Sequence, residues 1–229
     1  MPADQAAGLR RRNASQLQRC IHVLSDSAAS TPRLAHALHQ RGWTVLLVDA
    51  SGRLLADASP RALFDWRQQL ARGQAQTLPM PYGDAWHAPG VQADEPALTA
   101  LARRYDCLLF DARPDAADWM PRPDSAHTLV LDMRPEAAAV QRGYAWLKTV
   151  SSLGGRVSVG LLGDADACDR LQAACTRFLD PAFAGGVFSV AHEVDAFAAL
   201  AVRMAVEETH LMARSATENI GNMALKHGG

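Results

Sequence analysis

Short apolar runs alternate with helix-forming segments along most of this chain of 229 residues. Thr44–Val48 is almost wholly apolar, as expected of a strand that is buried on both faces of a parallel sheet. Thr31 followed by Pro32 is typical of a helix start, and Gly42 of a helix end. Repeated β-α-β units of this kind place helices on both faces of a sheet. The sequence therefore predicts an α/β fold with a mainly parallel sheet flanked by helices.

The expected elements and boundaries follow from this alternation. Strands are expected at 20–24, 44–48, 107–110, 127–131, 157–162 and 187–190. Helices are expected at 31–40, 59–73, 94–104, 135–150, 166–178 and 193–214. Residues 74–93 are rich in Pro and Gly and are expected to be irregular. Residues 1–18 are polar and lie outside the alternation, so we expect a flexible N-terminal arm, one domain over 19–214 and a tail over 215–229.

Composition narrows the functional classes. A hydrophobic content of 48% is enough for a sizeable core, and a net charge of −1 gives no basic footprint for nucleic acid. The start of the chain has no apolar signal segment, and no uncharged run approaches the ~20 residues that span a bilayer. The four cysteines show no disulfide pattern and are expected to be small core residues: Cys20, Cys107, Cys168 and Cys175. We therefore expect a cytoplasmic protein that binds no nucleic acid.

The motif D-Q-A-x-x-L-R occupies Asp4–Arg10 at the start of the chain. As a short helix it would place Asp4 near the positive end of the helix dipole, with Gln5 and Leu9 on one face. So short a helix is marginal in water and would fold mainly on docking. The alternative is a disordered terminus, as in many chains.

This motif ahead of an α/β domain resembles the activator segment of FlhG, a MinD-like ATPase that controls flagellar number and placement. In FlhG proteins the segment docks on FlhF, a GTPase of the signal-recognition-particle type, and stimulates its GTP hydrolysis. The resemblance implies that a FlhF-type GTPase is the partner and that these residues contact it: Asp4, Gln5, Ala6, Leu9 and Arg10. Gln5 would position the attacking water in the partner's site, Leu9 would anchor the arm, and Arg10 would pair with acidic or phosphate groups.

The domain resembles the same MinD/ParA superfamily in two strands. Residues 40–50 are similar to the family's strand after the first helix, and residues 105–111 to its YDxxxxD strand. Asp49 matches the first acidic residue of the former, Ser51 replaces the second, and Asp111 falls at the Walker B-like position, where a carboxylate serves Mg²⁺ and water. The simpler interpretation, which we favour here, is that both carboxylates cap the turns that follow their strands. In that case their replacement by Asn should leave stability nearly unchanged.

The family's phosphate-binding loop has no counterpart in this chain. Residues 25–32 read Ser-Asp-Ser-Ala-Ala-Ser-Thr-Pro, with no Gly and no Lys. Phosphate cradling requires glycines that let successive backbone N–H groups face the anion, and a Lys that meets the β- and γ-phosphates. Asp26 adds negative charge at this place. We therefore expect a degenerate P-loop NTPase fold with a vestigial nucleotide site at Asp26, Asp49 and Asp111, and with no metal and no cofactor.

The resemblance implies a non-catalytic, FlhG-like regulator of flagellar number or placement, in which any catalytic effect occurs in trans through Gln5. One alternative is an active MinD-like ATPase switch with an unorthodox phosphate site that still uses Asp49 and Asp111. Another is a pseudo-ATPase partner of a different MinD/ParA-type protein, for example in cellulose secretion.

The tail bears a thin apolar stripe at four-residue spacing, and the stripe contains no aromatic residue. Helices that bind membrane surfaces usually show a larger apolar face and a basic polar face. We therefore expect membrane contact to be indirect, with recruitment to the cell pole or the inner membrane face through the partner. The sequence leaves the oligomeric state open and allows a homodimer.

Overall fold

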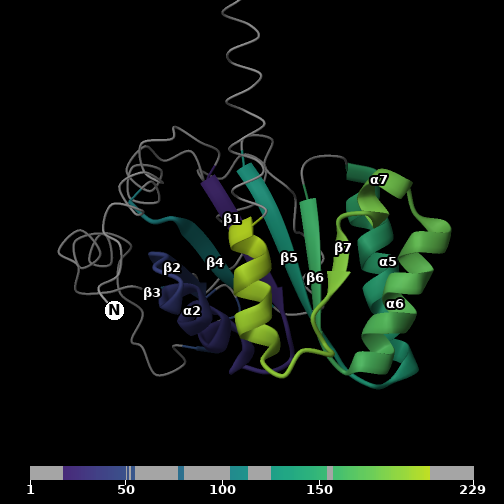
Figure 1. Ribbon diagram of the computed structural model, residues 1–229, viewed down its shortest axis with the longest axis horizontal. Coiled ribbons are helices and arrows are strands. Elements are labelled where there is room, and N and C mark those ends of the chain that lie inside the picture. The colour runs from purple at the N-terminus through teal and green to yellow at the C-terminus, as the bar shows by residue number, and fades with distance from the viewer. Residues whose placement is uncertain are drawn as a thin grey trace, which may run out of the picture.

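The computed structural model describes residues 18–49, 51, 53–54, 77–79, 104–112, 125–153 and 157–206. Within these residues the chain forms a seven-stranded sheet with the order β3-β2-β4-β1-β5-β6-β7 (Figure 1). The strands are β1 (Gln18–Leu24), β2 (Val45–Asp49), β3 (Thr77–Pro79), β4 (Cys107–Ala112), β5 (Ser125–Met133), β6 (Val157–Gly163) and β7 (Val187–Ser189). Every neighbouring pair is parallel. The expected α/β class is confirmed, and the arrangement is consistent with that of P-loop NTPases.

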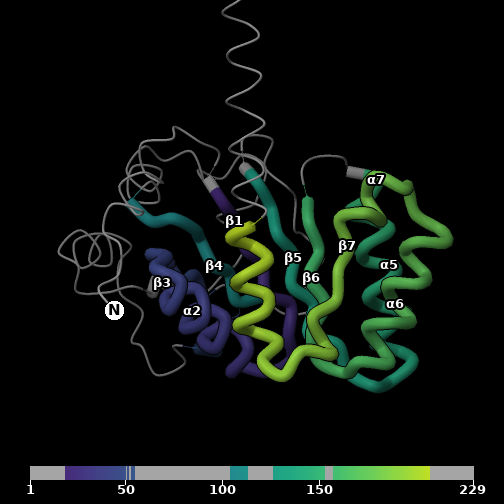
Figure 2. Tube along the Cα trace, viewed as in Figure 1, coloured from purple at the N-terminus to yellow at the C-terminus, as the bar shows by residue number. Residues whose placement is uncertain are grey.

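Helices lie against both faces of this sheet. They are α2 (Ser30–Gln40), α5 (Ala137–Leu153), α6 (Ala165–Phe178), α7 (Pro181–Ala184) and the C-terminal helix, of which residues 196–206 are described. The Cα trace shows α2 and the C-terminal helix side by side over the middle of the sheet, and α5 beside α6 near β6 and β7 (Figure 2). The chain therefore has the layered arrangement expected from its β-α-β pattern.

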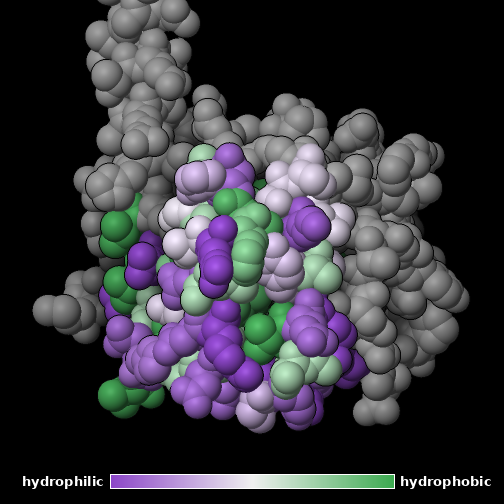
Figure 3. Space-filling view, turned by 90° about the vertical axis from the view of Figure 1, so that its right-hand side faces the viewer, coloured by the Kyte–Doolittle hydropathy of each residue, from purple (hydrophilic) through white to green (hydrophobic). Residues whose placement is uncertain are grey.

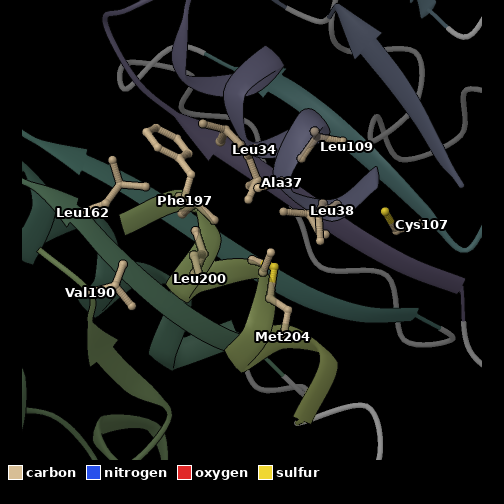
Figure 4. Close-up of a cluster of buried hydrophobic side chains, with 14 of the residues drawn as sticks. Leu34, Ala37, Leu38, Cys107, Leu109, Leu162, Val190, Phe197, Leu200 and Met204 are labelled. Carbon is tan, nitrogen blue, oxygen red and sulfur yellow. The ribbon is translucent and has the colours of Figure 1, made fainter. Parts of the chain in front are cut away.

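The first core cluster lies between the sheet and the pair formed by α2 and the C-terminal helix. Leu34 and Leu38 of α2 approach Leu200 and Met204 of the C-terminal helix (Figure 4). All four side chains are 0% exposed. Full burial of a leucine-sized side chain contributes roughly 1.5–3 kcal/mol, so this cluster is a main source of the domain's stability.

The second core cluster lies under α5 and α6. It includes Leu147 of α5 and Leu171 of α6, packed on Leu129 and Val159 of the sheet. Alternation along the strands separates the two clusters, because neighbouring residues point to opposite faces. The four cysteines are buried and form no disulfide, as expected for small core residues.

The end of α2 follows the sequence signal closely. Gly42 has a φ of 78°, in the left-handed region that favours glycine. Its N–H donates to the His39 carbonyl at 2.8 Å, and the Trp43 N–H donates to the Leu38 carbonyl at 3.1 Å. These two bonds form a Schellman motif, which satisfies carbonyls left without partners at the helix end. The next residue, Trp43, has a buried side chain, and β2 begins two residues later.

The structure departs from the expected elements in three places. The short helix α7 lies in a segment where no helix is expected from the sequence. Thr77–Pro79 pairs with β2 as a short strand inside the segment expected to be irregular, because a strand of three residues is too short to show a periodic apolar pattern. The last helix begins at residue 196 rather than 193, because Asp195 accepts a hydrogen bond from the Ala198 N–H at 3.0 Å and thereby caps the first turn. The helix expected at 59–73 and all but the last residue of the helix expected at 94–104 lie outside the described residues.

The face over α5, α6 and α7 is mostly hydrophilic, with scattered hydrophobic side chains (Figure 3). Phe178 at the end of α6 is 63% exposed and lies edge-on to Tyr144 of α5. Among the described helices, none combines the length and apolarity that a membrane crossing requires.

Candidate functional site

Two carboxylates singled out from the sequence lie side by side at the carboxyl ends of their strands. Asp49 ends β2, and Asp111 is its partner in the register of β4. Both residues are 0% exposed. Asp111 lies on the face covered by α2, because Leu109, two residues earlier, belongs to the cluster under that helix. Two buried carboxylates at one place require compensating donors or cations.

Arg53 supplies that compensation. Its guanidinium donates from Nε to Asp111 Oδ2 and from Nη2 to Asp111 Oδ1, both at 2.8 Å. The third nitrogen, Nη1, donates to the Ser25 carbonyl at 2.7 Å. Paired bonds between a guanidinium and a carboxylate are among the strongest hydrogen bonds in proteins. The hydrogen bond to Asp111 raises the pKa of Arg53 above its ordinary value, although partial burial acts in the opposite direction, so the guanidinium stays charged.

Two hydroxyl groups complete the surroundings of Asp111. Thr31 in the first turn of α2 donates to Oδ1 at 2.5 Å, and Ser51 donates to Oδ2. With Arg53, the carboxylate accepts four hydrogen bonds from three side chains. The expectation that Asp111 only caps the turn after its strand is therefore corrected: it joins α2 to the segment that follows β2.

Asp49 does behave as a turn cap. Its Oδ2 accepts from the Leu54 N–H at 3.1 Å, and its Oδ1 lies 3.2 Å from the Ser51 hydroxyl oxygen, whose single hydrogen is shared with Asp111. The Ser51 N–H also donates to the Asp111 carbonyl at 3.0 Å. Ser51, Arg53 and Leu54 thus bind across the ends of β2 and β4, and Arg53 reaches β1 through Ser25.

The connection between β1 and α2 is tied to a third carboxylate, Asp132 near the end of β5. Asp132 Oδ2 accepts from the Ser25 hydroxyl at 2.7 Å and from the Ser30 hydroxyl at 2.6 Å. The Ser25 hydroxyl also accepts from the Ser27 N–H at 2.9 Å. The segment between β1 and α2 therefore uses its polar groups internally. The Ser25 and Ser30 hydroxyls bind Asp132, and the Ser27 N–H binds Ser25, so these groups do not face an anion. Ser25 and Ser30 are buried in consequence.

Asp26 does not join the other two predicted site residues in this network. Its carboxylate is 47% exposed and pairs with Arg134 Nε at 3.0 Å. It lies just after β1 and at the mouth of a different pocket, described below. Of the three residues predicted for the vestigial site, the structure thus brings together Asp49 and Asp111.

Sequence reasoning misses Arg53 and Asp132 and assigns other roles to Thr31 and Ser51. The sequence predicts Thr31 as the cap of α2, but the residue before the helix is Ala29, which makes no side-chain cap. Ser51 stands out in the sequence only as the replacement of an acidic residue. Arg53 has one available signal: it is the first cation after a strand that ends in Asp49.

The site holds a fixed cation of its own, the Arg53 guanidinium, at the Asp111 carboxylate. Each oxygen of Asp111 already accepts two hydrogen bonds, so a divalent ion could reach the carboxylate only by displacing at least one of these donors. Pro32 also removes one backbone donor from the first turn of α2, which leaves that helix end poorer in N–H groups. Among the described residues, no group of three or more His, Cys, Asp or Glu side chains could hold a metal ion.

Comparison with protein-family models and with curated protein sequences gave no match for this chain. The arm residues Asp4, Gln5, Ala6, Leu9 and Arg10 lie outside the described residues. The partner-binding role of this arm therefore stays an expectation from its motif.

Proposed function

We propose that this chain is a non-catalytic, FlhG-like regulator whose N-terminal arm binds and stimulates a FlhF-type GTPase. The observation that carries the first half of the proposal is the Arg53–Asp111 pair. The motif at Asp4–Arg10 carries the second half. The two halves are independent. The first says that the domain does not bind nucleotide, and the second says that the arm binds a GTPase.

The Arg53–Asp111 pair supports the absence of nucleotide chemistry. A Mg²⁺–nucleotide complex would have to displace hydrogen-bond donors that already occupy the Asp111 carboxylate, including the paired bonds from Arg53. The chain offers neither a loop lysine nor loop glycines at 25–32 to compensate for that displacement. The domain then acts as a scaffold rather than a nucleotide switch.

The arm joins the domain at the amino end of β1, away from the Arg53–Asp111 pair. Arg19, at the amino end of β1, donates from Nη1 to the Met204 carbonyl at 2.8 Å and lies over the Trp43 ring. The junction between arm and domain therefore lies beside the C-terminal helix. The length of β1, roughly 20 Å at ~3.3 Å per residue, separates this point from the Arg53–Asp111 pair at the carboxyl edge.

The arm's chemistry suits a GTPase partner. Hydrolysis of GTP needs a group that orients water against the γ-phosphate, and the Gln5 amide both donates and accepts hydrogen bonds. Leu9 would provide an apolar anchor on the same helix face, and Arg10 a cation for acidic or phosphate groups. These roles predict different kinetic effects for the three side chains.

The test measures GTP turnover and binding of the FlhF-type GTPase with the full-length chain. Gln5→Ala should abolish stimulation but keep most of the affinity, whereas Leu9→Ala and Arg10→Ala should weaken binding. Gln16→Ala, in the same arm but outside the motif, is the matched control and should behave as wild type. Undiminished stimulation by Gln5→Ala would show that the arm is only a tether, and the trans-acting role would be rejected.

A further inference from the structure

A small pocket opens at the carboxyl edge of the sheet between β1, β5 and α5. It has a volume of about 50 Å³. The residues that line it are Leu24, Asp26, Leu131, Asp132, Met133, Arg134, Ala139, Arg142, Gly143 and Trp146. Charged, aromatic and apolar side chains therefore meet at one small opening.

The topology favours ligand binding at this place. After β1 the chain moves toward one edge of the sheet to form β2. After β5 it moves toward the opposite edge to form β6. The strands β1 and β5 are neighbours, so they form the point at which the strand order reverses. In open α/β sheets, ligands bind outside the carboxyl ends of the strands at this switch point.

The pocket is distinct from the Arg53–Asp111 site. Leu24, Leu131 and Met133 belong to the cluster under α5 and α6, whereas Asp111 contacts Thr31 of α2 on the opposite face. The connection between β1 and α2 lies between the pocket and the Arg53–Asp111 site. A ligand in the pocket would therefore contact neither Arg53 nor Asp111.

The charges that line the pocket leave one cation available. Arg134 is paired with Asp26. Asp132 keeps its negative charge, but its neighbours Leu131 and Met133 face α5, and its own Oδ2 accepts from the Ser25 and Ser30 hydroxyls on the side of α2. The Arg142 side chain makes no hydrogen bond or ion pair within the part of the chain that the structure describes. It lies one turn before Trp146 on α5, so the two side chains share a helix face. The pocket thus combines a guanidinium, an aromatic ring and apolar walls.

The size of the pocket limits its occupant. One water molecule needs about 10–15 Å³ of cavity volume, so about 50 Å³ has room for roughly four non-hydrogen groups. This is about the size of a carboxylate with its adjoining carbon. Gly143 keeps the α5 wall close to the sheet, because a Cβ there would lie 3.1 Å from Leu171 and 3.5 Å from Met133.

We propose that this pocket binds a carboxylate group, paired with Arg142 and with its carbon stem against Trp146. The carboxylate belongs either to a small dicarboxylic acid or to an acidic side chain of a peptide. Binding adds a charge-assisted hydrogen bond at a guanidinium that otherwise faces solvent. The proposal does not depend on the arm or on the fate of the nucleotide site.

The test titrates the full-length protein with succinate and, separately, with a capped hexa-aspartate peptide, at constant ionic strength. The readout is the indole N–H resonance of Trp146, which the variant Trp146→Phe identifies. We expect saturable shifts with a Kd of roughly 1–10 mM for the better ligand. Saturation by succinate would indicate a metabolite-type ligand, and saturation by the peptide alone would indicate a protein source.

Variants decide whether the pocket is responsible. Arg142→Gln should weaken binding by about tenfold or more, because it removes the charge and the paired donors. Arg177→Gln is the matched control: it removes an exposed arginine of α6 that lies over Phe178, and it should leave binding unchanged. Equal binding by Arg142→Gln and wild type, or no saturable shift with either ligand, would overturn the proposal.

Discussion

The Arg53 guanidinium binds the Asp111 carboxylate through two parallel hydrogen bonds of 2.8 Å. Asp111 is 0% exposed, whereas the Arg53 side chain is 21% exposed. The pair therefore joins the buried end of β4 to a segment near the surface. It also gives the buried Asp111 carboxylate a positively charged partner from the protein itself.

Substitution of Arg53 should destabilise the fold. Arg53→Gln leaves the buried Asp111 carboxylate with hydroxyl donors but without a counter-charge. We expect a loss of about 2–3 kcal/mol in the free energy of unfolding, below the about 3–5 kcal/mol of fully buried pairs because Arg53 is partly solvated. Urea unfolding measures this change.

Two further variants identify the ion pair as the cause. Asp111→Asn in the Arg53→Gln background should recover part of the loss, because it removes the uncompensated charge. Arg134→Gln breaks the exposed pair with Asp26 at the same edge and should cost less than about 1 kcal/mol. Equal effects of Arg53→Gln and Arg134→Gln would contradict the structural role given to Arg53.

Gly163 should tolerate no side chain. It has a φ of 99°, and a Cβ there would lie 2.3 Å from the Met133 carbonyl oxygen. The left-handed backbone alone costs about 1–2 kcal/mol, and the contact with backbone adds to it. We expect Gly163→Ala to lower stability by more than about 2 kcal/mol in thermal or urea unfolding. Gly185→Ala, whose φ is −65° and whose nearest contact is 3.3 Å, should be much milder.

The buried thiols should make stability fall at alkaline pH. Burial raises the pKa of Cys168 to about 12 and that of Cys175 to about 11. The unfolded chain ionises its thiols near a pH of about 8.5, so it releases protons that the folded chain retains. Stability is therefore lost as pH rises above about 8.5, and the loss continues until the folded thiols ionise.

We expect each thiol to contribute about 1–2 kcal/mol of this loss between about pH 8 and about pH 10. Comparison of wild type with Cys175→Val isolates one thiol from the tyrosines and lysines that titrate in the same range. The free energy of unfolding of Cys175→Val should fall less steeply with rising pH than that of wild type. Native protein should also resist alkylation near neutral pH, and rapid labelling of Cys168 or Cys175 under those conditions would refute their burial.

The fold is largely predictable from the sequence, and the site is not. Buried parallel strands such as β4 are apolar over most of their length, and helix ends such as Gly42 carry their own local signals, so sequence patterns locate them. The Arg53–Asp111 pair joins residues far apart in the chain, and the Ser25 and Ser30 bonds to Asp132 do the same. Such contacts depend on strand order, which places β1 between β4 and β5. No local pattern encodes that order.

The central inference about this domain is that it carries no nucleotide chemistry and serves as a scaffold for its arm. Calorimetric titration of the full-length wild-type protein with Mg²⁺-ATP tests this inference most directly. With Arg53 bound to Asp111 and no lysine at 25–32, we predict no measurable binding up to about millimolar nucleotide. Saturable binding of Mg²⁺-ATP at micromolar concentration, competed by ADP, would contradict the inference and favour an active ATPase switch.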